Sequence, residues 1–199
     1  MIQSEKFVNI RKSVKKVLDR DRYQHTLGVA YTAACLAMKY GEDLDRAYIA
    51  GLLHDCAKYI ADGERITLCR KWGISYSRAE SRSPQLLHAK MGAYLAEHEY
   101  EITDQGVLSA IRYHTTGRPD MTLLEKIIYV SDYIEPNRDK APNLAAYRQE
   151  AFTDLDRTVS LIAQDTIEHI KSRHYELDTL TADTYEFYRA LTETEKENG

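Results

Sequence analysis

Glycine and proline are scarce in this sequence: its 199 residues include 9 glycines and 4 prolines. So few turn-forming residues leave little to close many β-hairpins, and they exclude a long disordered linker. The composition, 43% hydrophobic and 29% charged, is typical of a soluble globular protein with one sizeable core. We therefore expect an all-α fold in a single domain that spans residues 1–199.

Other absences exclude whole classes of function. No apolar run approaches the roughly 18 residues of a membrane span, and charges scattered through the first residues exclude a secretory signal. A formal charge of −4 lacks the broad positive field of nucleic-acid binders. Cys35, Cys56 and Cys69 form no C-x-x-C pair and are odd in number, so we expect reduced core thiols in a cytoplasmic protein. We expect no nucleic-acid partner and no membrane partner.

Apolar residues at helical spacing predict about eight or nine helices. Asp19 or Asp21, Asp43 and Asp104 are the expected caps of three of them. The expected helices run over about 2–18, 23–41, 43–54, 62–72, 84–95, 104–114, 121–134, 144–173 and 181–195. The serine-rich segment 74–83 is predicted to be a surface loop, a possible lid. We expect a core at about 21–140 with the C-terminal helices 144–195 packed on it.

Four of the seven histidines have apolar or small neighbours near predicted helix ends or inner faces: His25, His54, His88 and His114. The other three have charged neighbours and are predicted to lie on the surface: His98, His169 and His174. A single histidine on a helix is usually a surface or satisfied core residue. Four in such surroundings indicate a shared site.

Two aspartates, Asp55 and Asp132, lie in the same apolar surroundings. A buried, isolated carboxylate costs several kcal/mol unless a cation or a donor meets it. Imidazole with carboxylate suits first-row transition metals. Six such groups exceed the need of one open ion and suit a pair, and the divergence of His54 and Asp55 by about 100° suits an Asp55 that bridges two ions.

The arrangement of His25, His54-Asp55 and Asp132 resembles the H…HD…D signature of the HD-domain metal-dependent phosphohydrolases, and His88 and His114 resemble the two extra histidines of its dinuclear members. The segments 54–58, 114–117 and 132–138 resemble the bacterial symmetrical bis(5′-nucleosyl)-tetraphosphatases of the YqeK type. Ser131 stands where alanine is expected in that family.

The resemblance implies an HD-domain helical bundle and a metal-dependent phosphoric anhydride hydrolase. It implies two transition-metal ions, iron or else manganese, cobalt, nickel or zinc, and cleavage of diadenosine tetraphosphate into two ADP by a metal-bound hydroxide. The expected metal ligands are His25, His54, Asp55, His88, His114 and Asp132.

Substrate contacts are expected beside these ligands. Lys58 lies four residues after His54, hence on the same face if the helix continues, and is expected to act in catalysis with Asp55 by neutralising phosphate charge. Arg138 is expected either to bind phosphate or to pair with Glu135 or the next helix. The run Thr115-Thr116-Gly117 offers hydroxyls and N–H groups to substrate, or is only a helix-ending turn. Gly28 is expected to permit close approach of two helix backbones.

Other functions stay open at this point. Another HD phosphohydrolase would act on nucleoside mono-, di- or triphosphates, cyclic dinucleotides or alarmones. The longer H-H-E and G-Y-P motif of the cyclic-di-GMP phosphodiesterases is absent, which weakens that option. A diiron oxygenase and a non-catalytic nucleotide- or metal-sensing module are further alternatives. A homodimer is the expected assembly, because twofold dimers are the commonest oligomers.

Overall fold

The computed structural model describes residues 5–197, and its regular elements within that range are all helical. The elements are α1 (Glu5–Val17), α2 (Arg20–Tyr40), α3 (Leu44–Leu53), α4 (Asp62–Trp72), α5 (Arg78–Arg82), the 3₁₀-helix η1 (Pro84–Leu87), α6 (His88–His98), α7 (Gln105–Tyr113), α8 (Leu123–Ile134), α9 (Leu144–Glu150), α10 (Leu155–Ser172) and α11 (Thr179–Glu197). The predicted all-α class is confirmed. The expected Ile2 of the first helix lies outside the described residues.

Helix starts follow the capping residues read from the sequence. The side chains of Asp19, Asp43 and Asp104 accept N–H groups in the first turns of α2, α3 and α7, which satisfies donors that have no partner within the helix. Helix α4 begins at Asp62 and ends at Trp72 as predicted, and Ala61 before it makes no side-chain cap.

The segment 74–83 is not the loop that we expected. Ser77 and Glu80 form a capping box that opens the short helix α5. The Ser77 hydroxyl donates to Asp178, and Lys90 of α6 pairs with Glu80 at 2.7 Å. The segment is therefore tied both to α6 and to the residue just before α11.

The predicted long helix 144–173 is two helices, α9 and α10. Asp154 has an extended backbone (φ −142°, ψ 99°), and its side chain accepts from the N–H of Arg157, so a new helix begins there. This break and α5 explain why the described residues form eleven α-helices rather than eight or nine. The expected helix start at Pro84 is a 3₁₀ turn, with α6 following at His88.

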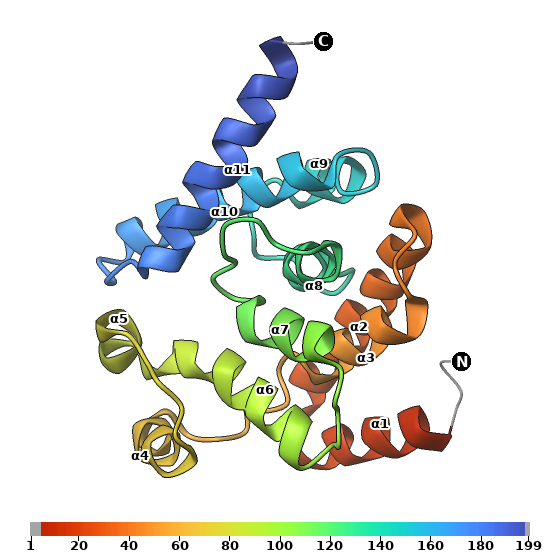
Figure 1. The fold of residues 1–199 in the computed structure, drawn as a ribbon, viewed down its shortest axis with the longest axis vertical. Helices are drawn as coiled ribbons and strands as arrows, with labels where there is room; N and C mark the ends of the chain where they lie inside the picture. Colours follow the sequence, from red (N-terminus) through yellow and green to blue (C-terminus); the bar gives the residue numbers. More distant parts are fainter. Residues whose placement is uncertain (1–4, 198–199) are drawn as a thin grey trace.

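The core surrounds α2, α3, α7 and α8. Helix α2 packs on α3 and α8, α7 contacts α6 and α8, and α10 joins α8 to α11, which extends away from the bundle (Figure 1). Ala30, Ala33 and Ala37 of α2 are fully buried, as its alanine content predicts. Helix α3 lies close to α2 at Gly51, where a Cβ would lie 2.8 Å from Cα of Ala30.

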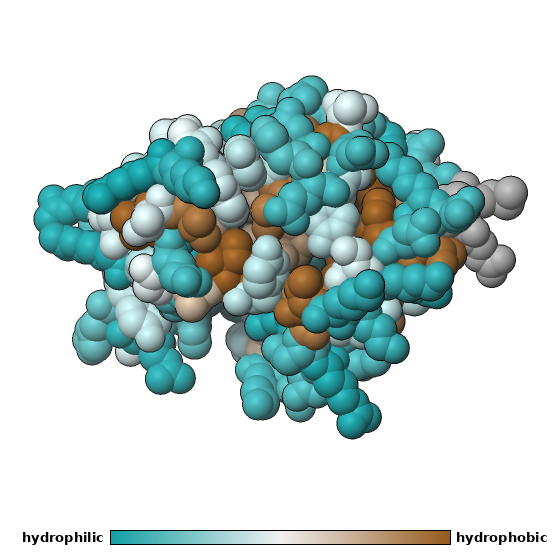
Figure 2. Space-filling view, turned by 90° about the horizontal axis from the view of Figure 1, so that it is seen from below, coloured by the Kyte–Doolittle hydropathy of each residue, from teal (hydrophilic) through white to brown (hydrophobic). Residues whose placement is uncertain are grey.

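The surface is mixed. On the face at the bottom of Figure 1, hydrophobic residues form separate patches among hydrophilic ones (Figure 2). Cys56 and Cys69 are core residues as predicted, but Cys35 is exposed on the outer side of α2. Among the described residues, no helix combines the length and the apolar character that crossing a bilayer requires.

Candidate metal centre

Four histidines converge from four different helices. His25 lies on α2 and His88 begins α6, whereas His54 and His114 directly follow α3 and α7 as their C-cap residues. His54, His88 and His114 are at most 3% exposed. The three histidines predicted to lie on the surface are exposed there: His98, His169 and His174.

Three of the four converging imidazole rings are oriented by a hydrogen bond to a nearby backbone carbonyl of the same turn. The Nδ1 atoms of His54, His88 and His114 lie 2.7, 2.5 and 2.7 Å from the carbonyl oxygens of the residue three positions earlier. A carbonyl oxygen only accepts, so each Nδ1 carries the proton and each neutral Nε2 presents a lone pair. Burial lowers the pKa of His54 to about 4, so that ring is neutral at neutral pH.

His25 is aimed by a carboxylate instead. Its Nδ1 lies 3.2 Å from Oε1 of Glu135, which is 1% exposed, and the second Glu135 oxygen accepts from the backbone N–H and the side-chain amide of Asn137. The expectation that Gly28 brings two helix backbones together is wrong, because the space beside it holds the Glu135 carboxylate. A carboxylate behind an imidazole is the arrangement that orients metal-binding histidines.

The inward nitrogens lie in two pairs. Nε2 of His25 lies 3.3 Å from Nε2 of His54, and Nε2 of His88 lies 3.1 Å from Nε2 of His114. Two lone pairs at this distance repel one another unless a cation lies between or beside them. The donor set therefore fits bound metal.

Asp55 faces both pairs with one carboxylate. Its Oδ1 lies 3.3 Å from Nε2 of His88 and 3.6 Å from Nε2 of His114, whereas its Oδ2 lies 3.6 Å from Nε2 of His54 and 3.9 Å from that of His25. Two groups able to hold a metal ion consequently share Asp55: His25, His54 and Asp55, and Asp55, His88 and His114.

Asp132 joins the first group. Its Oδ1 lies 3.0 Å from Nε2 of His25 and 3.9 Å from Nε2 of His54. Burial alone would raise the pKa of Asp132, but the neighbouring imidazole of His25 and the charge of Arg138 help to hold it well below its usual range. The carboxylate is therefore ionised and available to a cation.

Two arginines hold the two aspartates. Nη1 of Arg22 lies 2.8 Å from Oδ2 of Asp55, and Nη2 of Arg138 lies 3.0 Å from Oδ1 of Asp132. The expected salt bridge from Arg138 to Glu135 or the next helix is thus not the one observed. Sequence reasoning missed Arg22, although its place three residues before His25 puts both on one face of α2.

Lys58 approaches the centre by a different route from the one predicted. Helix α3 ends at Leu53, and residues 54–59 form turns, with the Lys58 N–H donating to the Asp55 carbonyl at 2.9 Å. The i to i+4 alignment with His54 is therefore wrong. Burial lowers the pKa of Lys58 while the Asp55 charge opposes that shift, so the ammonium lies within electrostatic reach of Asp55.

Residues 115–117 contact two different parts of the structure, the metal centre and helix α11. Oγ1 of Thr115 lies 3.2 Å from Nε2 of His88 and 3.1 Å from Nε2 of His114, inside the centre. The Thr116 carbonyl instead accepts from Thr184 of α11 at 3.0 Å. At Gly117 φ is 64°, and a Cβ would lie 2.7 Å from Cγ2 of Thr184, so the turn and the close approach both need glycine.

A cavity of about 590 Å³ opens beside the centre, between α8 and α10. Asp132, Thr115 and Arg138 are among its lining residues. Polar residues that sequence reasoning did not select also line it: Lys140, Asp165, Glu168 and His169. Their position depends on how α10 packs on α8, and a single sequence carries no local signal for that packing.

Comparisons with known proteins identify the family of the chain. The family model described as HD domain matches residues 22–137. A protein of Halalkalibacterium halodurans named symmetrical bis(5′-nucleosyl)-tetraphosphatase is 43% identical over 86% of this chain and 91% of its own length. A Bacillus subtilis protein of the same name is 41% identical over 81% of this chain and 86% of its own.

A solved structure shows the same fold. It is described as a predicted HD superfamily hydrolase involved in NAD metabolism from Clostridium acetobutylicum. It is 38% identical, covers 92% of this chain and 97% of its own, and superposes with a TM-score of 0.88. The chain belongs to the HD domain family, together with these proteins named symmetrical bis(5′-nucleosyl)-tetraphosphatase.

Proposed function

We propose that this chain hydrolyses diadenosine tetraphosphate symmetrically into two ADP at a dinuclear transition-metal centre. The observation that carries the proposal is Asp55, whose two carboxylate oxygens face two separate pairs of histidine nitrogens. The names of relatives 41% to 43% identical over most of the chain support the substrate.

The proposed ligands divide between the two ions. His25, His54 and Asp132 would hold one, His88 and His114 would hold the other, and Asp55 would bridge them. Nitrogen and carboxylate donors suit first-row transition metals, and we propose iron, to be compared with manganese, cobalt, nickel and zinc. Bound ions supply Lewis-acid polarisation of phosphoryl oxygens and activation of water.

The remaining residues bind and orient the phosphates. Lys58 lies near Asp55 and Thr115 lies beside His88, and both would contact phosphoryl oxygens. Arg138 pairs with Asp132 in the lining of the α8/α10 cavity. We do not assign Thr116 and Gly117 to the substrate, because both contact Thr184 of α11.

The cavity between α8 and α10 is lined by residues of both charges. Arg138 and Lys140 follow α8 in the chain, whereas Asp165 and Glu168 lie on α10. Carboxylates repel phosphate but accept hydrogen bonds from ribose hydroxyls. We therefore place the phosphates towards Arg138 and a ribose towards α10.

The test is product analysis with metal content measured on the same sample. Metal-loaded protein is incubated with diadenosine tetraphosphate and the nucleotides are separated by chromatography. ADP as the sole product is expected; AMP with ATP, or no turnover, contradicts the proposal. Asp55→Ala should lose both metal and turnover, whereas Asp21→Ala, on the exposed start of α2, should retain both. Equal turnover in wild type and Asp55→Ala would leave only a binding module.

The proposal also includes a homodimer in the cytoplasm. Cys56 and Cys69 are buried and free, which suits a reducing compartment. Sedimentation of the metal-loaded protein measures the assembly directly.

A further inference from the structure

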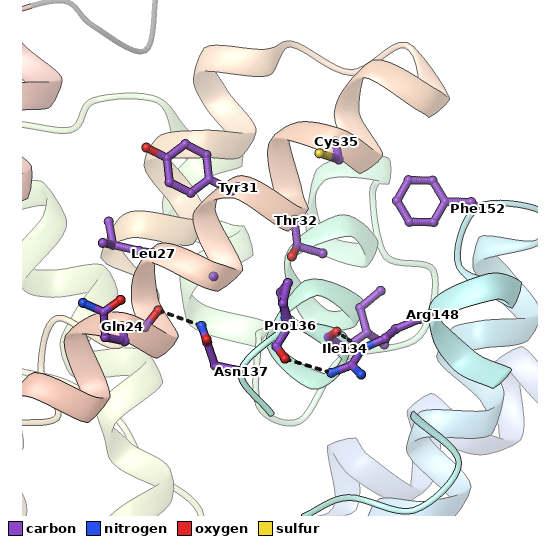
Figure 3. Close-up of a pocket in the computed structure, with 11 residues that line it drawn as sticks. Gln24, Leu27, Tyr31, Thr32, Cys35, Ile134, Pro136, Asn137, Arg148 and Phe152 are labelled. Carbon is purple, nitrogen blue, oxygen red and sulfur yellow. Dashed lines mark hydrogen bonds between the residues drawn. The ribbon is translucent and has the colours of Figure 1, made fainter. Parts of the chain in front are cut away.

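A second cavity, of about 650 Å³, opens between α2, the end of α8 and the turn after α9 (Figure 3). Leu27, Thr32 and Cys35 line it from α2, and Phe152 lines it from the other side. The Phe152 ring lies across the opening from Cys35 and is 37% exposed (Figure 3). An aromatic face is thus open to a ligand that enters this cavity.

Neighbouring residues of one segment line the two cavities. Pro136 and Asn137 line the α2/α9 cavity, whereas Arg138 and Lys140 line the α8/α10 cavity beside the metal centre. Asn137 also donates to Glu135, and Glu135 accepts from His25. Hydrogen bonds therefore connect the lining of the α2/α9 cavity to a proposed metal ligand.

The lining suits a nucleoside better than a phosphate. Two aromatic rings, of Tyr31 and Phe152, and aliphatic groups lie beside the amides of Gln24 and Asn137, and none of the lining residues is acidic. The Nδ2 atom of Asn137 donates to Glu135, which leaves its Oδ1 and the Gln24 amide for a base edge. The only basic residue in the lining, Arg148, donates to the carbonyls of Ile134 and Glu135 at 2.8 Å each. A purine stacks on aromatic rings, and amides pair with base edges.

The proposed substrate has two nucleosides, one at each end of four phosphates. Symmetrical cleavage requires the middle of the phosphate chain at the metal ligands, so the two nucleosides extend from the centre in different directions. The two cavities, of about 650 and 590 Å³, are similar in volume, and both fall within the ~300–1,000 Å³ of small-molecule pockets.

We infer that the α2/α9 cavity binds the second nucleoside of the substrate, with its base on Phe152. This inference rests on the proposed function and deepens it, because it assigns each half of the substrate a separate subsite. It distinguishes dinucleoside from mononucleoside polyphosphates: a ligand with one nucleoside fills only one cavity.

The experiment compares Phe152→Ala with Phe187→Ala, a matched control because both phenylalanines are 37% exposed and Phe187 lines neither cavity. Loss of one stacked base should raise KM for diadenosine tetraphosphate about 5- to 150-fold in Phe152→Ala, the equivalent of about 1–3 kcal/mol. Inhibition by adenosine 5′-tetraphosphate, which has one nucleoside, should change less than about twofold. Equilibrium dialysis of ADP should give two bound per wild-type chain and one per Phe152→Ala chain.

Two results would overturn the inference: an unchanged KM for diadenosine tetraphosphate in Phe152→Ala, and an equal weakening of both ligands. If the unchanged KM comes with a change from dimer to monomer, a second copy covers the cavity instead of a nucleoside. If wild type releases no ADP, the proposed function fails, and dialysis decides the cavity separately. One bound ADP per wild-type chain would then overturn the inference. Two bound ADP per wild-type chain and one per Phe152→Ala chain would support it.

Discussion

Gly28 on α2 leaves the space that the carboxylate of Glu135 occupies, and a Cβ at position 28 would collide with the Oε2 atom of Glu135. The same carboxylate accepts from Nδ1 of His25 with its other oxygen. A residue with no side chain therefore determines whether a proposed metal ligand keeps its orientation.

Gly28→Ala should push Glu135 away from His25 and weaken metal binding. Loss of the partner behind a metal-binding histidine typically costs about 10- to 100-fold in affinity, and we expect that range in calorimetric metal titration. Gly63→Ala is the matched control, since Gly63 is also helical and has no atom within 4 Å of a built Cβ. Equal metal affinity in the two variants would refute the link between Gly28 and His25.

Lys58→Ala should keep the metal and lose turnover. Its ammonium neutralises phosphate rather than binding the ions, so kcat should fall about 100-fold, as for removal of one preorganised group that stabilises transition-state charge. Metal analysis and steady-state kinetics on the same preparation make the distinction. Lys39→Ala, exposed near the end of α2, should behave as wild type. Metal loss in Lys58→Ala would show that its role is structural.

Ser131→Ala should stabilise the protein or leave its stability unchanged. The Ser131 Oγ is buried without a hydrogen-bond partner among the described residues, so it lacks the compensation that a buried hydroxyl needs. Removing it should raise the free energy of unfolding by about 1 kcal/mol in urea denaturation. In Ser81→Ala, which removes a hydroxyl that donates to the Arg78 carbonyl, no such gain is expected. Destabilisation by Ser131→Ala would mean that the hydroxyl has a partner in solution.

Acid should destabilise the protein partly through Glu125. Burial alone would raise the pKa of this carboxyl, but hydrogen bonds from Arg118, Ser109 and the N–H of Thr122 hold it below its usual value. A folded-state pKa below the unfolded one gives stability that is present above the unfolded pKa, about 4.3, and is lost as pH falls through the folded pKa.

Glu125→Gln should therefore cost about 1–3 kcal/mol at pH 7 and progressively less as the pH falls from 6 to 3. Unfolding curves of both proteins over this range test the expectation. Glu64→Gln, on the exposed side of α4, should follow wild type throughout. A difference that stays constant with pH would show that the Glu125 charge contributes nothing.

Features with local causes could be predicted from the sequence. Capping aspartates marked the starts of α2, α3 and α7, and apolar neighbours identified the four converging histidines. The S-x-x-E pattern at Ser77 was also readable and would have revealed α5.

Features that depend on packing could not be predicted. The Glu135 partner of His25 lies 110 residues away in the chain, and the α8/α10 cavity exists only because α10 packs on α8. The α9/α10 break was missed because the hydrophobic period continues across Asp154, whose extended backbone starts a new helix.

The carbonyl bonds to His54, His88 and His114 have a consequence for exchange of the ions. Each ring keeps its Nδ1 bond within its own helix-terminal turn whether or not an ion is bound, and this bond opposes the repulsion between the inward nitrogens. Binding then requires little ordering of the chain, and chelation followed by reloading should be reversible without refolding. We therefore expect the three histidine-bearing turns to keep their conformation after the ions are removed.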